Sequence, residues 1–324
     1  MYTFEKCQKI IEKCLKEIKL PAEPASLYDP IRYVFGLEGK RIRPCLTLLA
    51  CNLFADSVEE SINPALAIEL FHNFTLLHDD IMDSSEIRRG QLTVHKKWNS
   101  NVAILSGDAM LIKAYDYLSQ SPESVLSDVL VIFNKTALQV CEGQQYDIDF
   151  ESSMKVTVED YLKMIELKTA VLIAASLKIG AICGGAGKKD SDLLYQFGRN
   201  LGIAFQLQDD LLDVYADPNV FGKSRGNDIV ANKKTYLLTN ALTFAKGKIL
   251  KNLTDWLRKE EFDRAEKIKA VTEIYNNLNI NKLTEFRIKE YFREARLSLD
   301  KVPVSKERKT VLEEIAYQLM KREK

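Results

Sequence analysis

Two aspartate clusters share one pattern, Asp79-Asp80-Ile81-Met82-Asp83 and Asp209-Asp210-Leu211-Leu212-Asp213. On a helix, residues four positions apart share a face, with about 5–6 Å between their Cβ atoms, and like charges at that spacing repel. Each cluster follows an apolar run, where carboxylates are costly to bury unless positive charge compensates them. Magnesium supplies such charge, because it is usually held by one or two carboxylates together with substrate phosphates. Two aspartate walls could therefore hold magnesium ions with a diphosphate between them; the alternative is a pair of solvated helix ends.

Basic residues that could bind a diphosphate occur in three further segments. Residues 39–44, Gly-Lys-Arg-Ile-Arg-Pro, place cations just before a predicted helix, where they oppose the helix dipole unless an anion binds there. Arg88-Arg89-Gly90 follows the first aspartate cluster, and a guanidinium group can donate two parallel hydrogen bonds to a phosphate. Lys168-Thr169 lies inside an apolar helical segment, where a lysine either extends to the surface or meets an anion.

Three residues are weaker candidates when each is taken alone. Lys223 and Lys233 flank the segment after the second cluster, and loop lysines are mostly solvated. His72 lies two helical turns before Asp79 on the same face. A histidine with satisfied hydrogen bonds in the core is the default interpretation there, and the neighbouring clusters make a phosphate contact credible.

The composition narrows the class of protein. The 324 residues contain 46 Lys and Arg against 46 Asp and Glu, so no overall field favours nucleic acid or an anionic membrane. The longest apolar stretch, residues 170–187, contains Lys178 and is shorter than the ~20 apolar residues of a membrane span. Six cysteines without a Cys-x-x-Cys pair, and only three histidines, argue against a zinc site and a disulfide framework. The charged, amphipathic start is unlike a signal peptide, so we expect a cytoplasmic protein.

The apolar pattern predicts an all-α protein. Apolar residues recur at three- and four-residue spacing, sustained two-residue alternation is missing, and glycine and proline are sparse. We expect about ten or more helices in a single domain spanning residues 1–324. One helix should begin at Asn63, with Pro64 in its first turn, and carry the first aspartate cluster. Others are predicted over roughly 158–184, 190–215 and 307–322, with a loop over 219–234.

Taken in order, these segments resemble the trans-polyprenyl diphosphate synthases, the polyprenyl synthetase family. The resemblance runs from residues 39–44 to Asn232-Lys233-Lys234-Thr235-Tyr236 and includes 104–110 (ILSGDAM) and 142–147 (EGQQYD). It implies the isoprenoid synthase fold, a helical bundle around a deep central cavity, and a homodimer. It also implies a magnesium-dependent transferase that condenses isopentenyl diphosphate with dimethylallyl, geranyl or farnesyl diphosphate.

The same resemblance assigns roles to individual residues. Asp79, Asp83 and Asp209 would bind Mg²⁺ as a cluster of up to three ions, with Asp80, Asp210 and Asp213 in support. The isopentenyl diphosphate site would comprise Gly39, Lys40, Arg43, His72 and Arg89. The allylic diphosphate site would comprise Arg88, Lys168, Thr169, Gln206, Lys223 and Lys233.

This chain departs from the family pattern in two places. Glu38 precedes Gly39, where the family often has a second glycine; the effect should be small because the cations that follow are present. The loop before Lys233 carries an additional Arg225 and is a residue longer than in many relatives. Lys234 could therefore serve in place of Lys233.

Product length is expected to depend on Phe74, five residues before Asp79. The helical rise puts it ~7–8 Å beyond the metal site along the axis, and a bulky residue there resembles the short-chain members of the family. Thr75 beside it is small, so the floor would be incomplete. This indicates a C15 or C20 product, with C20 slightly ahead; the alternative is that Phe74 is ordinary core packing.

Two other functions remain open from the sequence. A class I terpene cyclase also uses an aspartate-rich helix and magnesium, but it needs no second diphosphate site, and its second metal motif is usually of Asn/Ser/Glu type. A catalytically silent subunit of a heteromeric synthase would generally have lost aspartates from one or both clusters. All six aspartates are present here.

Overall fold

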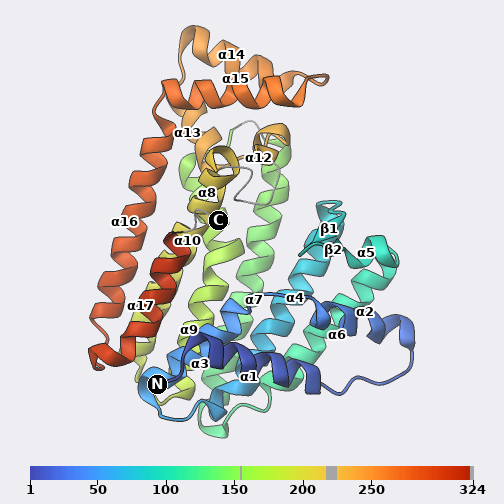
Figure 1. Ribbon diagram of the computed structural model, residues 1–324, viewed down its shortest axis with the longest axis vertical. Coiled ribbons are helices and arrows are strands. Elements are labelled where there is room, and N and C mark those ends of the chain that lie inside the picture. The colour runs from blue at the N-terminus through green and yellow to red at the C-terminus, as the bar shows by residue number, and fades with distance from the viewer. Residues whose placement is uncertain (154, 217–224, 322–324) are drawn as a thin grey trace. The chain divides into compact units, whose positions relative to one another are not determined.

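The computed structural model describes residues 1–153, 155–216 and 225–321, and nearly all of its regular structure is helical (Figure 1). This confirms the all-α prediction. The described residues fall into two compact units. The first comprises residues 1–135, 175–195 and 302–312, and the second the described parts of 136–174, 196–301 and 313–324. Each unit is described by itself below, and the single domain over 1–324 stays a prediction.

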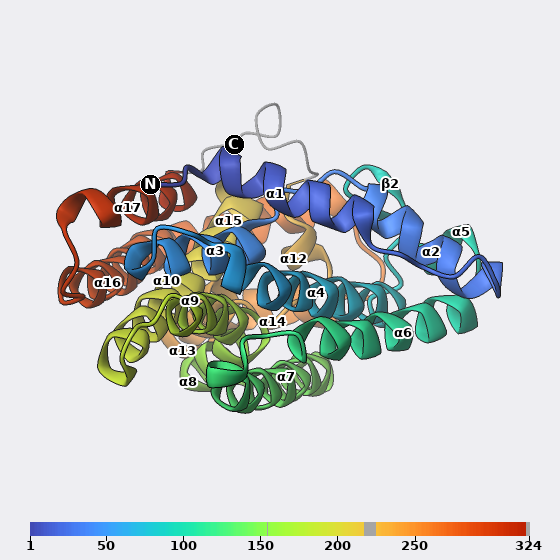
Figure 2. The ribbon, with the colours of Figure 1, turned by 90° about the horizontal axis from the view of Figure 1, so that it is seen from below.

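The first unit is built around two long helices. Its elements are α1 (Phe4–Glu17), α2 (Ala25–Gly36), α3 (Ile42–Phe54), the 3-10 turn η1 (Glu59–Ser61), α4 (Ile62–Met82), β1 (Ile87–Arg88), β2 (Gln91–Leu92), α5 (Val94–Lys97), α6 (Ser100–Leu118) and the start of α7 (Glu123–Ser152). Helix α4 packs against α3 and α6 (Figures 1 and 2). Residues 64–71 of α4 are all buried, as expected for a helix that is apolar all round. The core of this unit therefore fixes the helix that carries the first aspartate cluster.

The second unit carries the other cluster on α10. Its elements are α8 (Val158–Ile165), the π-helical turn η2 (Glu166–Ala170), α12 (Asn227–Val230), α13 (Tyr236–Phe244), α14 (Gly247–Arg258), α15 (Arg264–Asn277) and α16 (Ile280–Asp300). Four helices, α7, α9 (Val171–Cys183), α10 (Lys188–Tyr215) and α17 (Lys306–Met320), contribute residues to both units. Leu207 and Leu211 of α10 pack in one core with Tyr161, Leu237 and Tyr275.

Side-chain caps explain where several helices begin. Thr157 and Asp160 form a capping box at the start of α8, with each side chain bonded to the other residue's backbone N–H. Thr235 caps α13 and Asp263 caps α15, each with a side chain that accepts from a backbone N–H of the first turn. The caps thus set the ends of the elements that surround the second cluster.

The structure differs from the sequence predictions in three segments. The helix expected over 158–184 contains the π-helical turn η2, and the loop expected over 219–234 contains α12. Residues 87–92 form a two-stranded antiparallel pair, with Ile87 opposite Leu92 and Arg88 opposite Gln91. Arg89 and Gly90 form its turn and both have positive φ, 54° and 74°, as a type I′ hairpin turn requires. The pair is too short to leave an alternating pattern.

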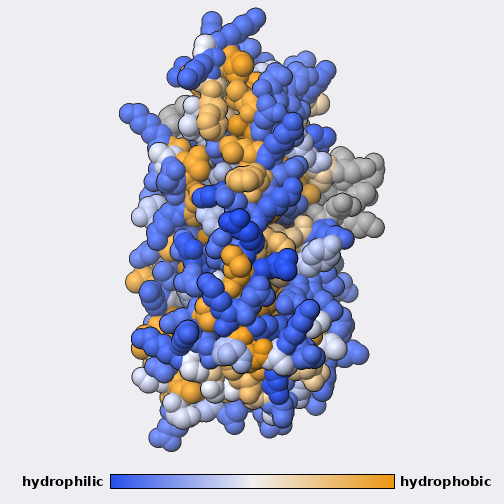
Figure 3. Space-filling model, turned by 90° about the vertical axis from the view of Figure 1, so that its left-hand side faces the viewer, coloured by the Kyte–Doolittle hydropathy of each residue, from blue (hydrophilic) through white to orange (hydrophobic). Residues whose placement is uncertain are grey.

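One described helix, α7, is long and apolar enough to cross a membrane by length and composition alone, although only 22% of its apolar window is buried. Core helices and signal sequences pass the same test, so a single such helix is weak evidence for a span. On the face drawn in Figure 3, hydrophilic residues predominate and hydrophobic residues occur between them in small groups.

Candidate active site

The first aspartate cluster ends α4, and its three carboxylates have different surroundings. Asp80 is 4% exposed, and Arg88 donates to its Oδ1 from both Nε and Nη2 at 2.8 Å. Burial raises the pKa of Asp80, and the Arg88 charge opposes this shift. Asp79 is partly exposed and Asp83 is exposed. Asp80 is therefore a buried support for the hairpin, and the outer pair presents its oxygens on one face.

The hairpin after α4 positions both of its arginines. Arg88 is held by Asp80, and its contact with the allylic diphosphate stays a prediction. Arg89 lies in the turn and reaches the loop before α3: a Cβ added at Gly39 would lie 3.0 Å from its Nη1. The absence of a side chain at Gly39 thus lets this guanidinium group approach the loop.

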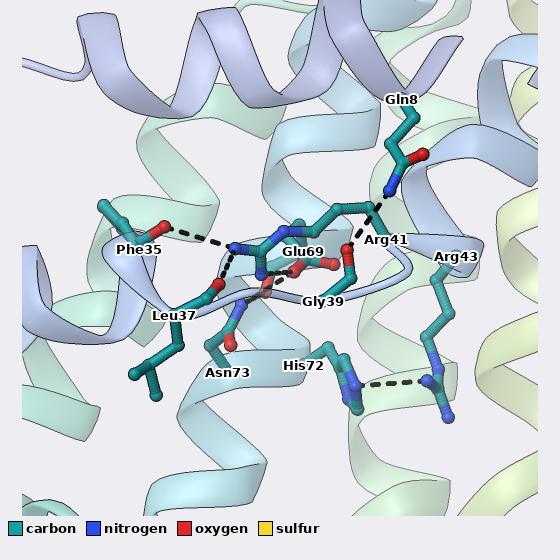
Figure 4. A network of polar contacts seen from close by, with 9 residues as sticks. All are labelled: Gln8, Phe35, Leu37, Gly39, Arg41, Arg43, Glu69, His72 and Asn73. Carbon is teal, nitrogen blue, oxygen red and sulfur yellow. Dashed lines mark hydrogen bonds and ion pairs between the residues drawn. The ribbon is translucent and has the colours of Figure 1, made fainter. Parts of the chain in front are cut away.

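Arg43 and His72 form the polar pair closest to what an anion site requires. Arg43 Nη1 lies 3.1 Å from His72 Nε2 (Figure 4), so the imidazole accepts there in its neutral form. Burial lowers the pKa of His72 well below its usual range, and Arg43 and Arg89 lower it further. Burial also lowers the pKa of Arg43, to about 10. Arg43 Nε is buried and has no hydrogen-bond partner among the described residues, so a donor is left for a phosphate oxygen.

In the second aspartate cluster, as in the first, the middle aspartate is buried and the outer two are more exposed. Asp210 is 4% exposed and accepts from the Tyr161 hydroxyl, from Gln206 Nε2 at 3.2 Å and from the Tyr236 backbone N–H at 3.3 Å. Burial raises the pKa of Asp210 to about 7 despite these donors. Asp209 and Asp213 are partly exposed. Asp210 thus ties α10 to α8 and α13, and the outer aspartates remain accessible.

The π-helical turn brings Lys168 and Thr169 to α10 and α7. Thr169 Oγ1 donates to Gln206 Oε1 at 3.2 Å, so a continuous polar chain leads from Thr169 through Gln206 to Asp210. Lys168 Nζ pairs with Asp147 Oδ2 at 2.6 Å. Lys168 therefore meets an anion of its own unit and does not simply extend to solvent. Three of the predicted residues of the allylic site or its metal support, Thr169, Gln206 and Asp210, lie in this one network.

The segment after the second cluster is fixed by backbone contacts to it. Asp213 Oδ2 accepts from the Asp228 N–H at 3.1 Å, and Asp213 O accepts from the Gly226 N–H at 2.7 Å. Burial raises the pKa of Asp228 to about 6, and the Lys233 charge opposes the shift. Lys234 Nζ donates instead to the Asn232 carbonyl. Lys233 is thus the lysine whose charge acts on Asp228. Lys223 lies outside the described residues.

Several residues at the site were not predicted. Tyr161, Asp147 and Asp228 each contact or act on a predicted residue in the second unit, and Glu69 does so in the first. Asp147 stands inside the EGQQYD segment and Asp228 between two lysine positions, so their place in the sequence was a signal. Tyr161 is buried and lies 49 residues before Asp210, so it carries no such signal, because its role depends on tertiary contact.

The residues expected to limit product length lie on the α6 side of α4. The Phe74 ring packs against Phe71 and His78, with centroid distances of 5.7 Å and 4.8 Å. A Cβ added at Gly107 of α6 would lie 3.5 Å from Phe74 Cδ2. Thr75 donates its hydroxyl to the His72 carbonyl at 2.8 Å. Phe74 is therefore held in place by its neighbours and half-buried, and its effect on product length stays a prediction.

The aspartates fit Mg²⁺ by the chemistry of their oxygens. Among the described residues, no group of three or more His, Cys, Asp or Glu side chains is placed to hold a metal ion by itself. Magnesium does not need one, because one or two carboxylates with substrate phosphates and waters complete its shell. The middle aspartates are occupied by protein donors, and Asp79, Asp83 and Asp209 are the accessible residues that would hold the ion.

Comparison with known proteins places the chain in a class. The family model for polyprenyl synthetase matches residues 24–275, and the chain belongs to this family of prenyltransferases. It is 43% identical over 240 residues to the geranylgeranyl diphosphate synthase of Methanosarcina mazei, covering 73% of each chain. It is 38% identical over 253 residues to the geranylfarnesyl diphosphate synthase of Natronomonas pharaonis, covering 72% of this chain and 74% of the relative. A crystal structure of a geranylgeranyl pyrophosphate synthase superposes with a TM-score of 0.94 at 41% identity over 99% of both chains. The fold is therefore the isoprenoid synthase fold.

Proposed function

We propose that the protein is a short-chain prenyl diphosphate synthase that adds isopentenyl diphosphate to an allylic diphosphate and releases diphosphate. The observation that carries this proposal is the shared design of the two aspartate clusters. In each, a buried middle aspartate is bound by protein donors and the outer two, four residues apart, are partly or fully exposed, although Asp213 also accepts from the Asp228 N–H. Each unit also presents its own cations, so two diphosphates can be accommodated.

The first unit supplies the groups suited to isopentenyl diphosphate. The Arg43 guanidinium has an unpartnered buried Nε, and neutral His72 accepts from the same guanidinium. Lys40 is exposed in the loop before α3, and Arg89 is exposed in the hairpin turn. A guanidinium group that is already oriented by one contact loses less freedom when it binds a phosphate.

The second unit supplies the groups suited to the allylic substrate. Lys168, Thr169 and Lys233 would hold its diphosphate, with Gln206 fixing Thr169 from behind. Asp79, Asp83 and Asp209 would hold Mg²⁺, which when bound would offset the negative charge of the departing diphosphate. Preorganised donors at the place where charge develops lower the barrier without reorganising during the reaction.

The bond changes need no nucleophilic side chain. The allylic carbon–oxygen bond breaks, and its electron pair leaves with the diphosphate. The double bond of isopentenyl diphosphate then forms the new carbon–carbon bond to the allylic carbon, and one proton is lost to the released diphosphate. The apolar residues of α4 would exclude water, which would otherwise trap the allylic cation.

We infer a C20 product, with C15 and C25 as the alternatives. Phe74 is large and is held in place five residues before Asp79, which supports a short chain. The Methanosarcina relative is a geranylgeranyl and the Natronomonas relative a geranylfarnesyl diphosphate synthase. The comparisons thus favour C20 over the C15 product that the sequence left open.

We also propose a cytoplasmic homodimer. Five large apolar side chains of the first unit are exposed on α6 and α7: Ile104, Leu105, Ile112, Leu130 and Val131. Exposed apolar groups of this size commonly mark an interface, and a second copy of the chain would cover them.

The test is a condensation assay with purified protein. Radiolabelled isopentenyl diphosphate is incubated with dimethylallyl, geranyl or farnesyl diphosphate, and products are resolved by chain length. We expect activity with Mg²⁺, its loss in chelator, and a drop in kcat of about 100-fold or more for Asp79→Ala and Asp209→Ala, since removing one electrostatic group at a reacting centre typically costs that much. Hydrocarbon release from a long prenyl diphosphate alone would indicate a cyclase. Full turnover in chelator would refute the proposal, and activity that needs a second, different chain would indicate a silent subunit.

A further inference from the structure

Arg41 is the middle cation of the segment 39–44, and its side chain leaves the anion site. It is 6% exposed and donates to Glu69 Oε1 at 2.7 Å, to the Phe35 carbonyl at 3.2 Å and to the Leu37 carbonyl at 2.8 Å. Figure 4 shows the Arg41 and Arg43 side chains pointing in different directions, Arg41 from the loop before α3 and Arg43 from the first turn of α3. Arg41 therefore binds the protein, and its neighbours Lys40 and Arg43 are the residues predicted to bind substrate.

The partner of Arg41 is equally buried. Glu69 is 1% exposed, and Asn73 Nδ2 donates to both its Oε1 at 3.0 Å and its backbone carbonyl at 2.7 Å. Asn73 thereby keeps the carboxylate directed at Arg41. Such a buried pair is costly to desolvate and persists only when its geometry and extra hydrogen bonds are good, as they are here.

A cavity of about 500 Å³ lies beside the loop, α1 and α2, and residues 35–39 line it together with Arg41. Gln8 Nε2 reaches the Gly39 carbonyl at 3.3 Å, and the Arg89 guanidinium lies close to Gly39. Packing is therefore sparse on the cavity side of the loop, and the hydrogen bonds of Arg41 to Phe35, Leu37 and Glu69 are a main restraint on its position.

The backbone at Arg41 is strained in a way that serves this arrangement. Its φ is 48°, a left-handed conformation that costs an L-residue free energy and usually occurs where surrounding contacts impose it. Arg41 is also the residue at the N-terminal cap of α3, yet its side chain makes no cap. The conformation turns the chain so that Arg41 enters the core immediately before Arg43 joins α3.

One turn of α4 receives both arginines. Glu69 binds Arg41, and His72, three residues later on the same helix, contacts Arg43. Residues three apart on a helix are neighbours on its surface. The Arg41–Glu69 ion pair thus docks the loop on the same turn that supplies the histidine of the anion site.

We propose that Arg41 is a positioning residue, which acts through its buried pair with Glu69 to hold Lys40 and Arg43 in the geometry that binds isopentenyl diphosphate. The proposal rests on the proposed function for the identity of the ligand. Its alternative is that Arg41 binds the diphosphate directly by charge.

Glu69→Gln separates the two possibilities. If Arg41 acted by charge alone, removal of the neighbouring negative charge would tighten the binding of an anion. If the pair positions the loop, the same variant weakens binding, because the neutral amide holds the guanidinium less firmly. The sign of the change in Kd therefore decides, and Gln is close enough in shape to Glu for the helix to fold.

The measurement is calorimetric binding of isopentenyl diphosphate to the full chain without an allylic partner, so that no turnover occurs. A 1 Å misplacement can cost on the order of 100-fold, so we expect Arg41→Met to raise Kd by about tenfold or more. Arg41→Lys keeps the charge but cannot reach three acceptors at once, and it should raise Kd similarly. The Kd of a non-reactive allylic diphosphate analogue should change less than about twofold. That is well below a tenfold change, which corresponds to about 1.4 kcal/mol. Amide hydrogen exchange in residues 37–41 should accelerate in all three variants.

Arg293→Met is the matched control. Arg293 is an exposed arginine of α16 that pairs with Glu294, and its variant should bind isopentenyl diphosphate as the unchanged protein does. Unchanged or tighter binding by Glu69→Gln, or normal binding by Arg41→Lys, overturns the proposal and leaves the proposed function standing. If the unchanged protein itself does not bind isopentenyl diphosphate, the proposed function fails.

Discussion

At the scale of single residues, the three carboxylates of each aspartate cluster are of two kinds. Asp80 and Asp210 are buried and hold protein donors, and the outer aspartates are accessible. The pattern of the sequence predicts which residues share a helix face, but not which carboxylate is consumed by a tertiary contact. Arg88 for Asp80 and Tyr161 for Asp210 supply that contact from other elements.

Tyr161→Phe should destabilise the protein through Asp210. Loss of the hydroxyl leaves a buried carboxylate with one donor fewer, which costs about 1–3 kcal/mol. The tyrosine hydroxyl lowers the pKa of Asp210, so its removal raises a pKa that already lies at about 7. The destabilisation is therefore largest at pH values above the pKa of Asp210, where the carboxyl is ionised. It is largely absent below that pKa, where the carboxyl is protonated in the folded state. Urea unfolding should therefore show a larger loss at pH 8 than at pH 5.5.

Tyr215→Phe is the control for that comparison, because it removes a hydroxyl bond to Asn276 that is exposed. We expect a change within about 0.5 kcal/mol at both pH values. Equal losses for Tyr161→Phe at the two pH values would mean that Asp210 does not titrate as described.

Phe74→Ala should lengthen the product. The ring is anchored by Phe71 and His78, and its removal opens space on α4 at the level where a growing chain would end. We expect the main product to gain one or more C5 units, measured by chromatography of dephosphorylated prenols. Phe286→Ala, on an exposed phenylalanine of α16, should leave the product unchanged. A product distribution unaltered by Phe74→Ala would assign Phe74 to core packing alone.

At the scale of elements, the π-helical turn η2 decides where Lys168 and Thr169 lie. Arg199 clamps its first residue, donating from Nε and Nη2 to the two oxygens of Glu166 at 2.8 Å and 2.6 Å. On the other side, α7 approaches closely enough that a Cβ at Gly143 would lie 2.3 Å from the Lys168 backbone nitrogen. Mid-helix π turns often occur at functional sites, and this one is enclosed by contacts from two neighbouring helices.

Gly143→Ala should disturb that turn. Helix propensity alone would favour alanine by up to about 1 kcal/mol, but the new methyl group meets backbone, and overpacking costs about 1–3 kcal/mol. The net change should therefore be destabilising, with a higher KM for the allylic diphosphate. Gly36→Ala in α2, where a Cβ meets nothing within 4 Å, should be neutral or stabilising. Denaturant unfolding and steady-state kinetics of both variants test this, and a stabilised Gly143→Ala with normal KM would contradict it.

The sequence allowed the helices of this fold to be predicted better than their irregularities. Helix α10 was expected over 190–215 and spans Lys188–Tyr215, because strong apolar periodicity defines it. The turn η2 could not be predicted, because the residues that contact it, Gly143 and Arg199, lie outside its segment of the sequence. The Arg89-Gly90 hairpin and α12 are likewise too short for a periodic signal. For the site, the motifs located the cations, and tertiary contact decided that Arg41 and Arg88 bind the protein.

At the scale of the whole molecule, the balanced charge and the exposed apolar side chains both bear on whether copies of the chain associate. With 46 basic and 46 acidic residues, the chain lacks the net repulsion that keeps many proteins monomeric. The apolar residues exposed on α6 and α7 add surface that water disfavours. Both facts favour association of copies through this surface.

Val131→Glu should convert the expected dimer into a monomer. Val131 is 65% exposed on α7, so the substitution should not disturb the fold of one chain. In a two-fold symmetric interface each copy contributes the same patch, so two new carboxylates would be buried near one another. Unfavourable charges in an interface cost several kcal/mol, and we expect the dimer Kd to rise by about 100-fold or more. Light scattering coupled to size-exclusion chromatography, over a range of protein concentrations, measures the mass directly. Phe286→Glu, at a position of α16 that is 60% exposed, should leave the dimer intact. A monomeric unchanged protein, or a Val131→Glu variant that still dimerises, would show that this surface does not join two copies.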